Sequence, residues 1–347
     1  MAYRKRAYPH FIALRGIIKA GSLGPGLFSR EETVTTMFWK GKHIGLALGG
    51  GGARGLAHIG VLRVLDEESI PIDLIVGTSA GALVGGAYAS GISPSELEKK
   101  ADEYLNSPEF QSSAIRGFEK AQASAEMGLK RKIQNYLKNR YLVVQAMFKP
   151  GILSNEEFQE TINYFIPDIQ IEDMPISFRA VATDLLSGEQ IIFSKGPLRQ
   201  AVWASCAVPG AIAPLKEGEW LLSDGGIISL VPSSVARDEG ADVVIAVAVD
   251  RGLSPREDLR TVVDIYHRAS EIMGEKLKAY ELAEANVVIL PEVGELHWSN
   301  FSQAMNLIEE GEKATQRKIG DIRHYVPGIK KWLTFRKGKK PHKTRVH

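Results

Sequence analysis

The chain contains 347 residues, of which 44% are hydrophobic and 24% are charged, and its formal net charge is +2 at pH 7. A globular protein with a sizeable core is expected, and no apolar run is long enough for a transmembrane anchor. The single cysteine, Cys206, excludes an intrachain disulfide. The basic N-terminus is not followed by the continuous apolar segment of a secretory signal, so we expect a cytoplasmic protein.

Basic residues are concentrated at both ends of the chain. No acidic residue precedes Glu31 and none follows Asp321. In the C-terminal tail, lysines and arginines alternate with Trp332, Leu333 and Phe335, a composition that suits peripheral contact with an anionic membrane. Solvated tails without a partner are the alternative, and the sequence leaves both open. We expect no nucleic-acid partner.

A strand followed by a glycine-rich loop opens the globular part of the chain. Residues 43–48 are predicted to form a short buried strand, residues 49–52 are four consecutive glycines, and residues 56–68 show helical spacing. Consecutive glycines are favoured where the backbone approaches another group closely, or where several N–H groups point into one concavity. The loop therefore predicts an anion-binding corner at a helix N-terminus.

The spacing of Gly50, Gly52 and Gly55 also matches the dinucleotide-binding fingerprint. A Rossmann unit requires an acidic residue at the end of the next strand, whereas Asp73 precedes that strand. A phosphate-binding loop of the Walker type fails as well, because no Gly-Lys-Ser or Gly-Lys-Thr closes the glycines. No metal-binding cluster is evident either, so no cofactor and no metal are expected.

The next predicted strand, residues 74–78, runs into a Gly-x-Ser-x-Gly motif. Ser79 lies between Gly77 and Gly81, and the helix predicted from Ala80 is rich in small residues. A serine on such a strand-to-helix turn has strained backbone angles, points its Oγ outward and lies at the positive end of the helix dipole. Ser79 is therefore the candidate nucleophile, with the glycine loop as its oxyanion hole. Close packing of helix and strand is the alternative reason for the small residues.

The remaining elements follow as alternating helices and strands. Helices are predicted from Ser95 and in residues 120–148, 154–165, 198–203, 231–239, 259–286 and 301–319, and strands in residues 176–184, 190–193, 220–224, 242–249 and 287–290. This alternation predicts an α/β fold of three layers, in which a mostly parallel central sheet is covered by helices on both faces.

A second candidate for the chemistry ends the predicted strand 220–224. Asp224 is followed by Gly225 and Gly226, which favours a fixed direction for its carboxylate near the other loops of the sheet edge. A common Asp-Gly turn is the alternative. Cys206 lies among small residues without a histidine nearby in the sequence, so we expect a buried structural thiol.

Four sequence blocks occur in a fixed order: Gly-Gly-Gly-Ala-Arg-Gly at 50–55, Gly-Thr-Ser-Ala-Gly at 77–81, Ala-Ser-Cys-Ala-Val-Pro-Gly at 204–210 and Asp-Gly-Gly at 224–226. With these blocks the chain resembles the patatin-like phospholipase family over roughly residues 43–290. The resemblance implies a lipid acyl hydrolase, which is a serine esterase of the phospholipase A type. It also implies a fold related to that of the α/β-hydrolases.

The resemblance also implies roles for individual residues. Ser79 is the nucleophile, Asp224 is the base, and the amides of Gly50, Gly51 and Gly52 belong to the oxyanion hole. The implied reaction is the cleavage of a carboxylic ester bond in a phospholipid or related lipid. The other residues of the motifs support this geometry: Arg54, Gly55, Gly77, Gly81, Gly225 and Gly226.

The resemblance suggests a division of the chain into four parts. These are a basic N-terminal extension (1–42), a catalytic domain (43–290), a C-terminal helical segment (291–322) and a basic tail (323–347). The chain departs from the family pattern at Gly49, where many members carry aspartate, and this difference concerns the loop more than the chemistry.

Two other functions remain open. In an esterase with a Ser-His-Asp triad, the histidine follows the acid in the chain, which nominates His267 or His297. A regulatory protein that binds lipid without turnover is the other alternative, although such a protein needs neither the serine nor the aspartate. The sequence leaves open the lipid head group, the acyl-chain preference, the positional specificity and the oligomeric state.

Overall fold

The computed structural model describes residues 3–6, 42–113, 116–117, 153–250, 252–256, 259–294 and 296–326. The helix predicted in residues 120–148, most of the N-terminal extension and the tail beyond residue 326 lie outside these residues, as does the membrane contact expected of the two termini. Among the described helices, none combines the length and the apolar character that a bilayer crossing requires.

The described strands form one sheet of nine strands. Their order is β1-β5-β4-β3-β2-β8-β9, with β7 paired to β4 and β6 paired to β7. The strands are β1 (Tyr3–Arg6), β2 (Ile44–Leu48), β3 (Leu74–Thr78), β4 (Ser177–Asp184), β5 (Gln190–Phe193), β6 (Leu215–Glu217), β7 (Trp220–Asp224), β8 (Val243–Val247) and β9 (Val287–Ile289).

The sheet is mixed, with a parallel block and an antiparallel side. β4, β3, β2, β8 and β9 are parallel to one another, and the antiparallel strands β5, β1, β7 and β6 are added on the β4 side. The predicted α/β architecture is confirmed. β1 and β6 were not predicted, because three of the four residues of Tyr3–Arg6 are basic and Leu215–Glu217 is too short to show an alternating pattern.

Most described helices agree with the predicted ones to within about three residues at their ends, but α11 ends six residues later than predicted and α4 was not predicted. Ser154 and Glu157 form the capping box expected before residue 155. The helices are α1 (Ala57–Glu67), α2 (Ala80–Ala89), α3 (Pro94–Asn106), α4 (Pro108–Ser112), α7 (Asn155–Phe165), α8 (Leu198–Cys206), α9 (Ser233–Asp238), α10 (Val262–Ala283) and α11 (Ala304–Tyr325), and short 3-10 turns lie at Gly52–Leu56, Ile171–Asp173 and Gly225–Ile227.

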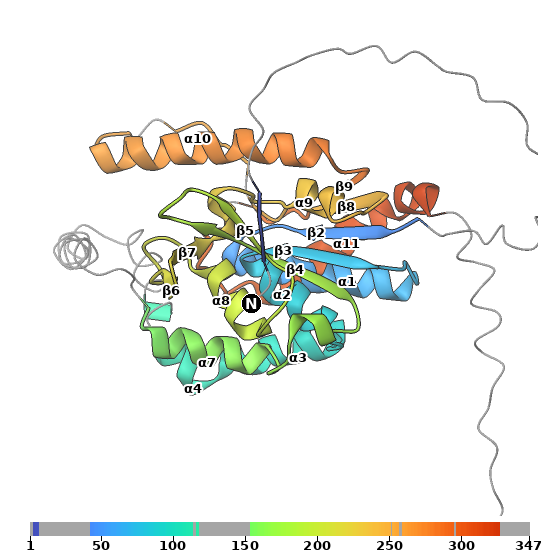
Figure 1. Cartoon of the computed structure of the whole chain (residues 1–347), viewed down its shortest axis with the longest axis horizontal. Coiled ribbons are helices and arrows are strands. Elements are labelled where there is room, and N and C mark those ends of the chain that lie inside the picture. The colour runs from blue at the N-terminus through green and yellow to red at the C-terminus, as the bar shows by residue number, and fades with distance from the viewer. Residues whose placement is uncertain are drawn as a thin grey trace, which may run out of the picture.

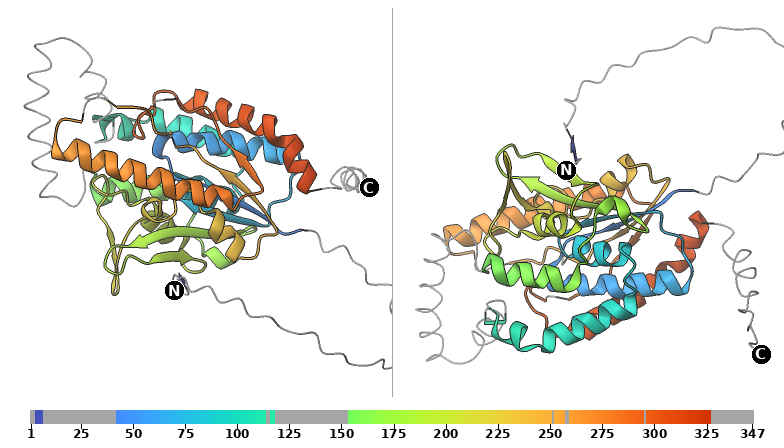
Figure 2. Two further views of the ribbon diagram at one scale, coloured as in Figure 1. Left: turned by 90° about the horizontal axis from the view of Figure 1, so that it is seen from above. Right: turned by 60° about the horizontal axis from the view of Figure 1, so that its bottom comes forward.

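Helices cover both faces of the sheet, as the three-layer prediction requires. In Figure 1, α9 and α10 lie above the sheet, and α1, α2 and α8 lie below it, while α11 packs against α1. α3 and α7 pack on the outer side of this lower layer, against α1 and α8 respectively. Figure 2 shows the same arrangement from above and from below, with α10 on the outside of the molecule.

Strand residues alternate between two apolar clusters, one for each helical layer. In β2, the side chains of Ile44, Leu46 and Leu48 join the cluster that contains α1, α2 and α8, whereas Ala47 joins the cluster that contains α9. β2 and β3 are buried along their whole length. A strand that is covered on both faces reads as a continuous apolar run, which is why these strands were recognisable from sequence.

α11 closes the lower layer by lying directly on α1. A Cβ atom on Gly311 would overlap the carbonyl oxygen of Ala57, and a Cβ atom on Gly60 would overlap the carbonyl oxygen of Ile308. Glycine at both positions lets the two backbones approach more closely than side chains would allow. The C-terminal helical segment is therefore packed into the same core as the strands that carry the site.

We expect Gly311→Ala to destabilise the protein by about 3 kcal/mol, because the added methyl group must push α11 away from α1. Gly320→Ala in the same helix is the matched control, since a Cβ atom there meets nothing within 4 Å. This control is expected to stabilise the protein by up to about 1 kcal/mol through helix propensity. Urea unfolding of both variants measures the difference, and equal stability would contradict the close approach of α11 and α1.

Candidate active site

Ser79 occupies the turn between β3 and α2. Its backbone angles are φ 53° and ψ −123°, a conformation that is rare for residues with a side chain. The turn is held by the Ser79 N–H, which donates to Ser205 Oγ at 2.9 Å, and Ser205 Oγ donates in turn to the Val181 carbonyl at 2.6 Å. Such strain persists only where the surroundings enforce it, and it directs the hydroxyl away from the strand.

The two glycines of the motif are required by close backbone contacts. A Cβ atom on Gly77 would lie 2.5 Å from the Cα atom of Ala82, and one on Gly81 would overlap the carbonyl of Leu48. The sharp turn thus folds α2 back onto the ends of β3 and β2. The free N–H groups of the first turn of α2 begin beside Ser79, where they favour negative charge.

Asp224 ends β7 and begins the 3-10 turn Gly225–Ile227. Its carboxylate Oδ1 accepts the Gly226 N–H at 2.7 Å. Its backbone is held on both sides, because the Asp224 N–H donates to Ala207 at 2.9 Å and the Asp224 carbonyl accepts from Thr183 Oγ1 at 2.9 Å. These bonds fix the direction of the carboxylate.

The register of the sheet brings the ends of β3 and β7 together. Thr78 pairs with Val181 of β4, and Asp224 pairs with the next residue, Ala182. Because both Val181 and Ala182 pair with β5 on their other side, β3 and β7 share one side of β4 and meet there end to end. A Cβ atom on Gly225 would accordingly lie 3.2 Å from the Thr78 side chain. Ser79 and Asp224, some 145 positions apart, are neighbours in space.

Burial sets the protonation behaviour of Asp224. Burial raises the pKa of its carboxyl group from 3.8 to about 6, although the Ser79 hydroxyl and the Gly226 N–H both lower it by favouring the charged form. The second oxygen, Oδ2, is buried without a hydrogen bond of ordinary geometry. A carboxylate with a pKa near 6 is ionised at neutral pH and is a better proton acceptor than an ordinary aspartate.

The glycine loop lies beside the serine. A Cβ atom on Gly50 would lie 3.2 Å from Ser79 Cβ, so the loop backbone and the nucleophile are adjacent. The Gly50 N–H, however, donates to the carbonyl of Leu230 at 2.9 Å. Gly51 and Gly52 precede and begin the 3-10 turn, a position where N–H groups have no acceptor within the helix. Their amides are thus better situated than that of Gly50 to receive an oxyanion.

The segment of residues 296–300 supports the glycine loop through Trp298. Ala53 donates its N–H to the Trp298 carbonyl at 2.6 Å, and a Cβ atom on Gly52, which has φ of +58°, would overlap that carbonyl. Arg54 Nε donates to the Gly51 carbonyl at 3.1 Å. The contribution of Trp298 was not predicted, because it is made by a backbone carbonyl that has no signature in the sequence.

His58 in α1 also holds the loop. Its imidazole is completely buried, and Nε2 lies 2.8 Å from the Gly49 carbonyl. Burial lowers the pKa of His58 to about 4, so the ring is neutral at physiological pH and Nε2 carries the proton that Gly49 accepts. The Gly49 N–H donates to Val247 at 2.9 Å, which ties the start of the loop to the sheet.

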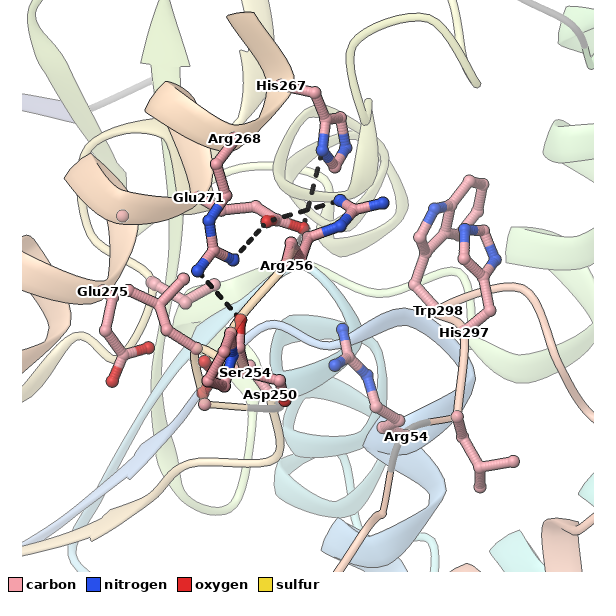
Figure 3. A pocket seen from close by; sticks show the side chains of 16 residues that line it. Arg54, Asp250, Ser254, Arg256, His267, Arg268, Glu271, Glu275, His297 and Trp298 are labelled. Carbon is pink, nitrogen blue, oxygen red and sulfur yellow. Dashed lines mark hydrogen bonds and ion pairs between the residues drawn. The ribbon is translucent and has the colours of Figure 1, made fainter. Parts of the chain in front are cut away.

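His267 and His297 line a different cavity from the one that contains Ser79. Both line a polar cavity of about 450 Å³ between α10 and the glycine loop, together with Arg54 and Glu271 (Figure 3). His267 Nδ1 lies 3.5 Å from a carboxylate oxygen of Glu271, and His297 Nδ1 lies 2.8 Å from Ser299 Oγ. Neither histidine is positioned on Asp224 by a described contact.

A second, largely apolar cavity of about 540 Å³ contains Ser79. It lies between α1 and α2 on one side and α3, α4 and α7 on the other, and the described residues that line it include no histidine. The start of the helical segment after Pro94 therefore covers the site. Representative lining side chains are Leu56, Leu83, Phe110, Phe158, Ile212 and Phe301.

Cys206 lines the same cavity, and its predicted structural role is confirmed. The thiol is buried and donates to the Ser79 carbonyl at 3.1 Å. Burial, with a smaller contribution from Asp224, raises the pKa of this thiol well above its usual value, so a thiolate is disfavoured. Ser205 thus bonds to the N–H of Ser79 and Cys206 bonds to its carbonyl, and both side chains hold the turn in place.

The fold and the site together define a mixed-sheet α/β protein in which a serine on a strand–helix turn lies beside a buried aspartate, a glycine loop and an apolar cavity. The chain belongs to the patatin-like phospholipase family, whose model matches residues 46–237, more than half of the chain.

Relatives share this region at moderate identity. An uncharacterized NTE family protein of Mycobacterium tuberculosis is 35% identical over 207 residues, which are 60% of this chain and 49% of that protein. Human patatin-like phospholipase domain-containing protein 6 is 35% identical over 240 residues, or 68% of this chain and 15% of that protein. The chain thus spans about half the length, or less, of these relatives. The crystal structure of VipD from Legionella pneumophila covers 82% of this chain and 67% of VipD, with 15% identity and a TM-score of 0.42.

Proposed function

We propose that the protein is a lipid acyl hydrolase that cleaves carboxylic ester bonds through Ser79 and Asp224. The observation that carries the proposal is the meeting of β3 and β7 beside β4, which brings the buried carboxylate next to the serine that lines an apolar cavity. Membership of the patatin-like phospholipase family supports the same activity.

The first half of the reaction forms an acyl-enzyme. Asp224 accepts the proton of the Ser79 hydroxyl as Oγ attacks the carbonyl carbon of the ester, and the alcohol part of the lipid leaves with a proton. In the second half, Asp224 accepts a proton from water as the water oxygen attacks the acyl carbon. The bond to Oγ then breaks, the fatty acid leaves, and Asp224 returns the proton to Ser79 Oγ. These steps use only protein groups and water.

The oxyanion of each tetrahedral intermediate is assigned to the glycine loop. Gly51 and Gly52 are the preferred donors, because the Gly50 N–H is already bonded to Leu230. Gly50 has a different role in this proposal: its lack of a side chain lets the loop backbone lie close to Ser79, and its N–H is not one of the donors to the oxyanion. One such donor is worth about 3 kcal/mol of transition-state stabilisation, which compensates for the weak basicity of a carboxylate.

The apolar cavity favours a long acyl chain as the part of the substrate that is bound. Its lining is dominated by aliphatic and aromatic side chains from α1, α2, α4 and α7. Burial of apolar surface contributes roughly 0.8 kcal/mol for each methylene group of the chain. Phospholipids and related lipid esters are therefore proposed as substrates over short polar esters.

A triad esterase and a lipid-binding regulator are the alternative functions, and one experiment distinguishes all three. The full chain is incubated with phosphatidylcholine, phosphatidylglycerol, lysophosphatidylcholine and triacylglycerol, and released fatty acids are identified by mass spectrometry. We expect release from at least one phospholipid, with His267→Ala and His297→Ala retaining activity within about twofold.

Loss of activity in either histidine variant would favour the triad. Absence of fatty-acid release, together with absence of labelling by a fluorophosphonate probe, would favour the regulator. Comparison of the lipids in the same experiment identifies the preferred head group.

A further inference from the structure

The outward side of α10 is apolar, which reverses the usual pattern of a surface helix. Large apolar side chains are exposed at successive turns: Val262 is 83% exposed, Ile265 56%, Tyr266 76%, Met273 64% and Tyr280 76%. Ile272, 42% exposed, lies on the same side, since positions three and four apart share one face of a helix. These six residues are called the outer face of α10.

Charged side chains attach the opposite side of α10 to the protein. Lys278 is buried and bonds to Asp250 at 2.7 Å and to Glu275 at 2.7 Å. Glu281 is buried and accepts from Ser229 Oγ at 2.8 Å and from Ser234 Oγ at 2.9 Å. Rotation of α10 to hide its outer face would break these buried bonds and leave the charges unpaired. The orientation is therefore built into the fold.

The outer face begins at the end of the molecule that holds the candidate active site. α10 is the next helix after β8 in the chain, and its inward side lines the polar cavity together with Arg54 of the glycine loop (Figure 3). Other exposed apolar side chains also follow the strand ends on this edge of the sheet. They include Leu185 and Leu186 after β4, Ile227 after Asp224, and Leu253 after β8.

The charges on this side of α10 are complementary to an anionic surface. Among the side chains of α10 that the structure describes as exposed, none is a carboxylate, whereas Lys276 lies among the apolar residues. Arg260, just before the helix, is exposed as well. Apolar residues, tyrosines and cations on one helical face are the combination that lies in the interface of an anionic bilayer.

We propose that the outer face of α10 seats the protein on an anionic lipid surface. The choice of lipid as the occupant rests on the proposed function, because an enzyme with an apolar cavity at its serine must take water-insoluble esters from an aggregate. The first turns of α10 enter the interface, Lys276 and Arg260 contact anionic head groups, and the edge of the sheet that carries Ser79 is held close to the lipid.

Co-sedimentation of the full chain with vesicles tests the proposal separately from catalysis when it is done in the Ser79→Ala background. The test variant is Ile265→Ser with Met273→Ser. The matched control is Ala279→Ser with Ala283→Ser, which adds two serines at exposed positions of the same helix but removes little apolar surface. Both pairs leave the basic termini unchanged, so binding through the termini is constant.

We expect the Ser79→Ala protein and the control to bind vesicles of phosphatidylcholine mixed with phosphatidylglycerol, and to bind several-fold more weakly to phosphatidylcholine alone. The test variant should bind the mixed vesicles about tenfold more weakly. With an active Ser79, the test variant should hydrolyse a water-soluble short-chain ester at the normal rate, which shows that the fold is intact.

Equal vesicle binding by the test variant and the control would overturn the proposal and assign any binding to the termini. A dimer that light scattering detects without lipid, and that Ile265→Ser with Met273→Ser dissociates while vesicle binding is absent throughout, would also overturn it in favour of a second copy. If binding is lost as expected but no variant hydrolyses any ester, the proposed function fails and the lipid-docking proposal stands.

Discussion

Ser79→Ala is expected to lower kcat for ester hydrolysis by about 10⁵-fold, because no acyl-enzyme can form without Oγ. Labelling by a fluorophosphonate probe should be lost in parallel. The fold should be retained, since alanine keeps the backbone N–H that donates to Ser205 Oγ and removes no buried apolar surface. Circular dichroism and thermal unfolding of the purified variant check this point.

Ser90→Ala is the control for this substitution. Ser90 lies just beyond the other end of α2, and its hydroxyl donates only to the local Ala87 carbonyl at 2.6 Å. The control should keep full activity. Retention of more than about one per cent of the activity by purified Ser79→Ala would rule out the nucleophile assignment.

Asp224→Asn is expected to lower kcat by about 10³-fold to 10⁴-fold, because an amide cannot accept the serine proton. In the unmodified protein, kcat/KM should fall about tenfold for each pH unit below about 6, where protonation removes the base. Asp173→Asn, a change at an exposed aspartate in the 3-10 turn Ile171–Asp173, should leave both the rate and the pH profile unchanged. An unchanged acid limb in Asp224→Asn with high residual activity would contradict the assignment.

The same substitution should stabilise the fold at alkaline pH. Because burial raises the pKa of Asp224 from 3.8 to about 6, the ionised carboxylate is less favourable in the folded than in the unfolded chain, by about 3 kcal/mol above pH 6. This penalty shrinks as the pH falls from about 6 towards 3.8. Asparagine removes the charge while its amide oxygen can still accept the Gly226 N–H.

Thermal unfolding at two pH values tests this sign. Asp224→Asn should have a Tm higher than the unmodified protein by a few degrees near pH 8, and the difference should nearly vanish near pH 4. A lower Tm for Asp224→Asn at pH 8 would contradict this prediction. It would mean that the surroundings stabilise the buried charge, so that the ionised carboxylate does not lower the stability of the fold.

Much of the fold and most of the candidate site could be predicted from short stretches of sequence. β2, β3 and β8 are buried on both faces and therefore read as apolar runs. The strained turn at Ser79 is indicated by Gly77 and Gly81, because only glycine fits the close contacts on either side. The structural thiol of Cys206 was expected because no histidine lies nearby in the sequence and free cysteines are usually buried. In each case the sequence pattern that makes the prediction lies within a few consecutive residues.

Other features depend on contacts that have no local signature. The carbonyl of Leu230 takes the Gly50 N–H out of the predicted oxyanion hole, and the carbonyl of Trp298 supports the glycine loop. Backbone carbonyls are present at every residue, so the sequence cannot show which of them will be an acceptor. The helix at 259–286 was predicted as amphipathic, but its outward apolar side depends on the buried bonds of Lys278 and Glu281.

The sequence alone determined most of the elements, their order, and the residues proposed to carry the chemistry, because helical and strand periodicity and glycine-dependent turns are short-range properties of the chain. Only the tertiary structure decided that Asp224 lies beside Ser79. That proximity follows from the pairing of β3 and β7 with successive residues of β4. This is a choice of register between segments that lie about a hundred positions apart for β3 and β4 and about forty for β4 and β7. Burial, and with it the raised pKa of the carboxylate, exists only once that pairing has been made.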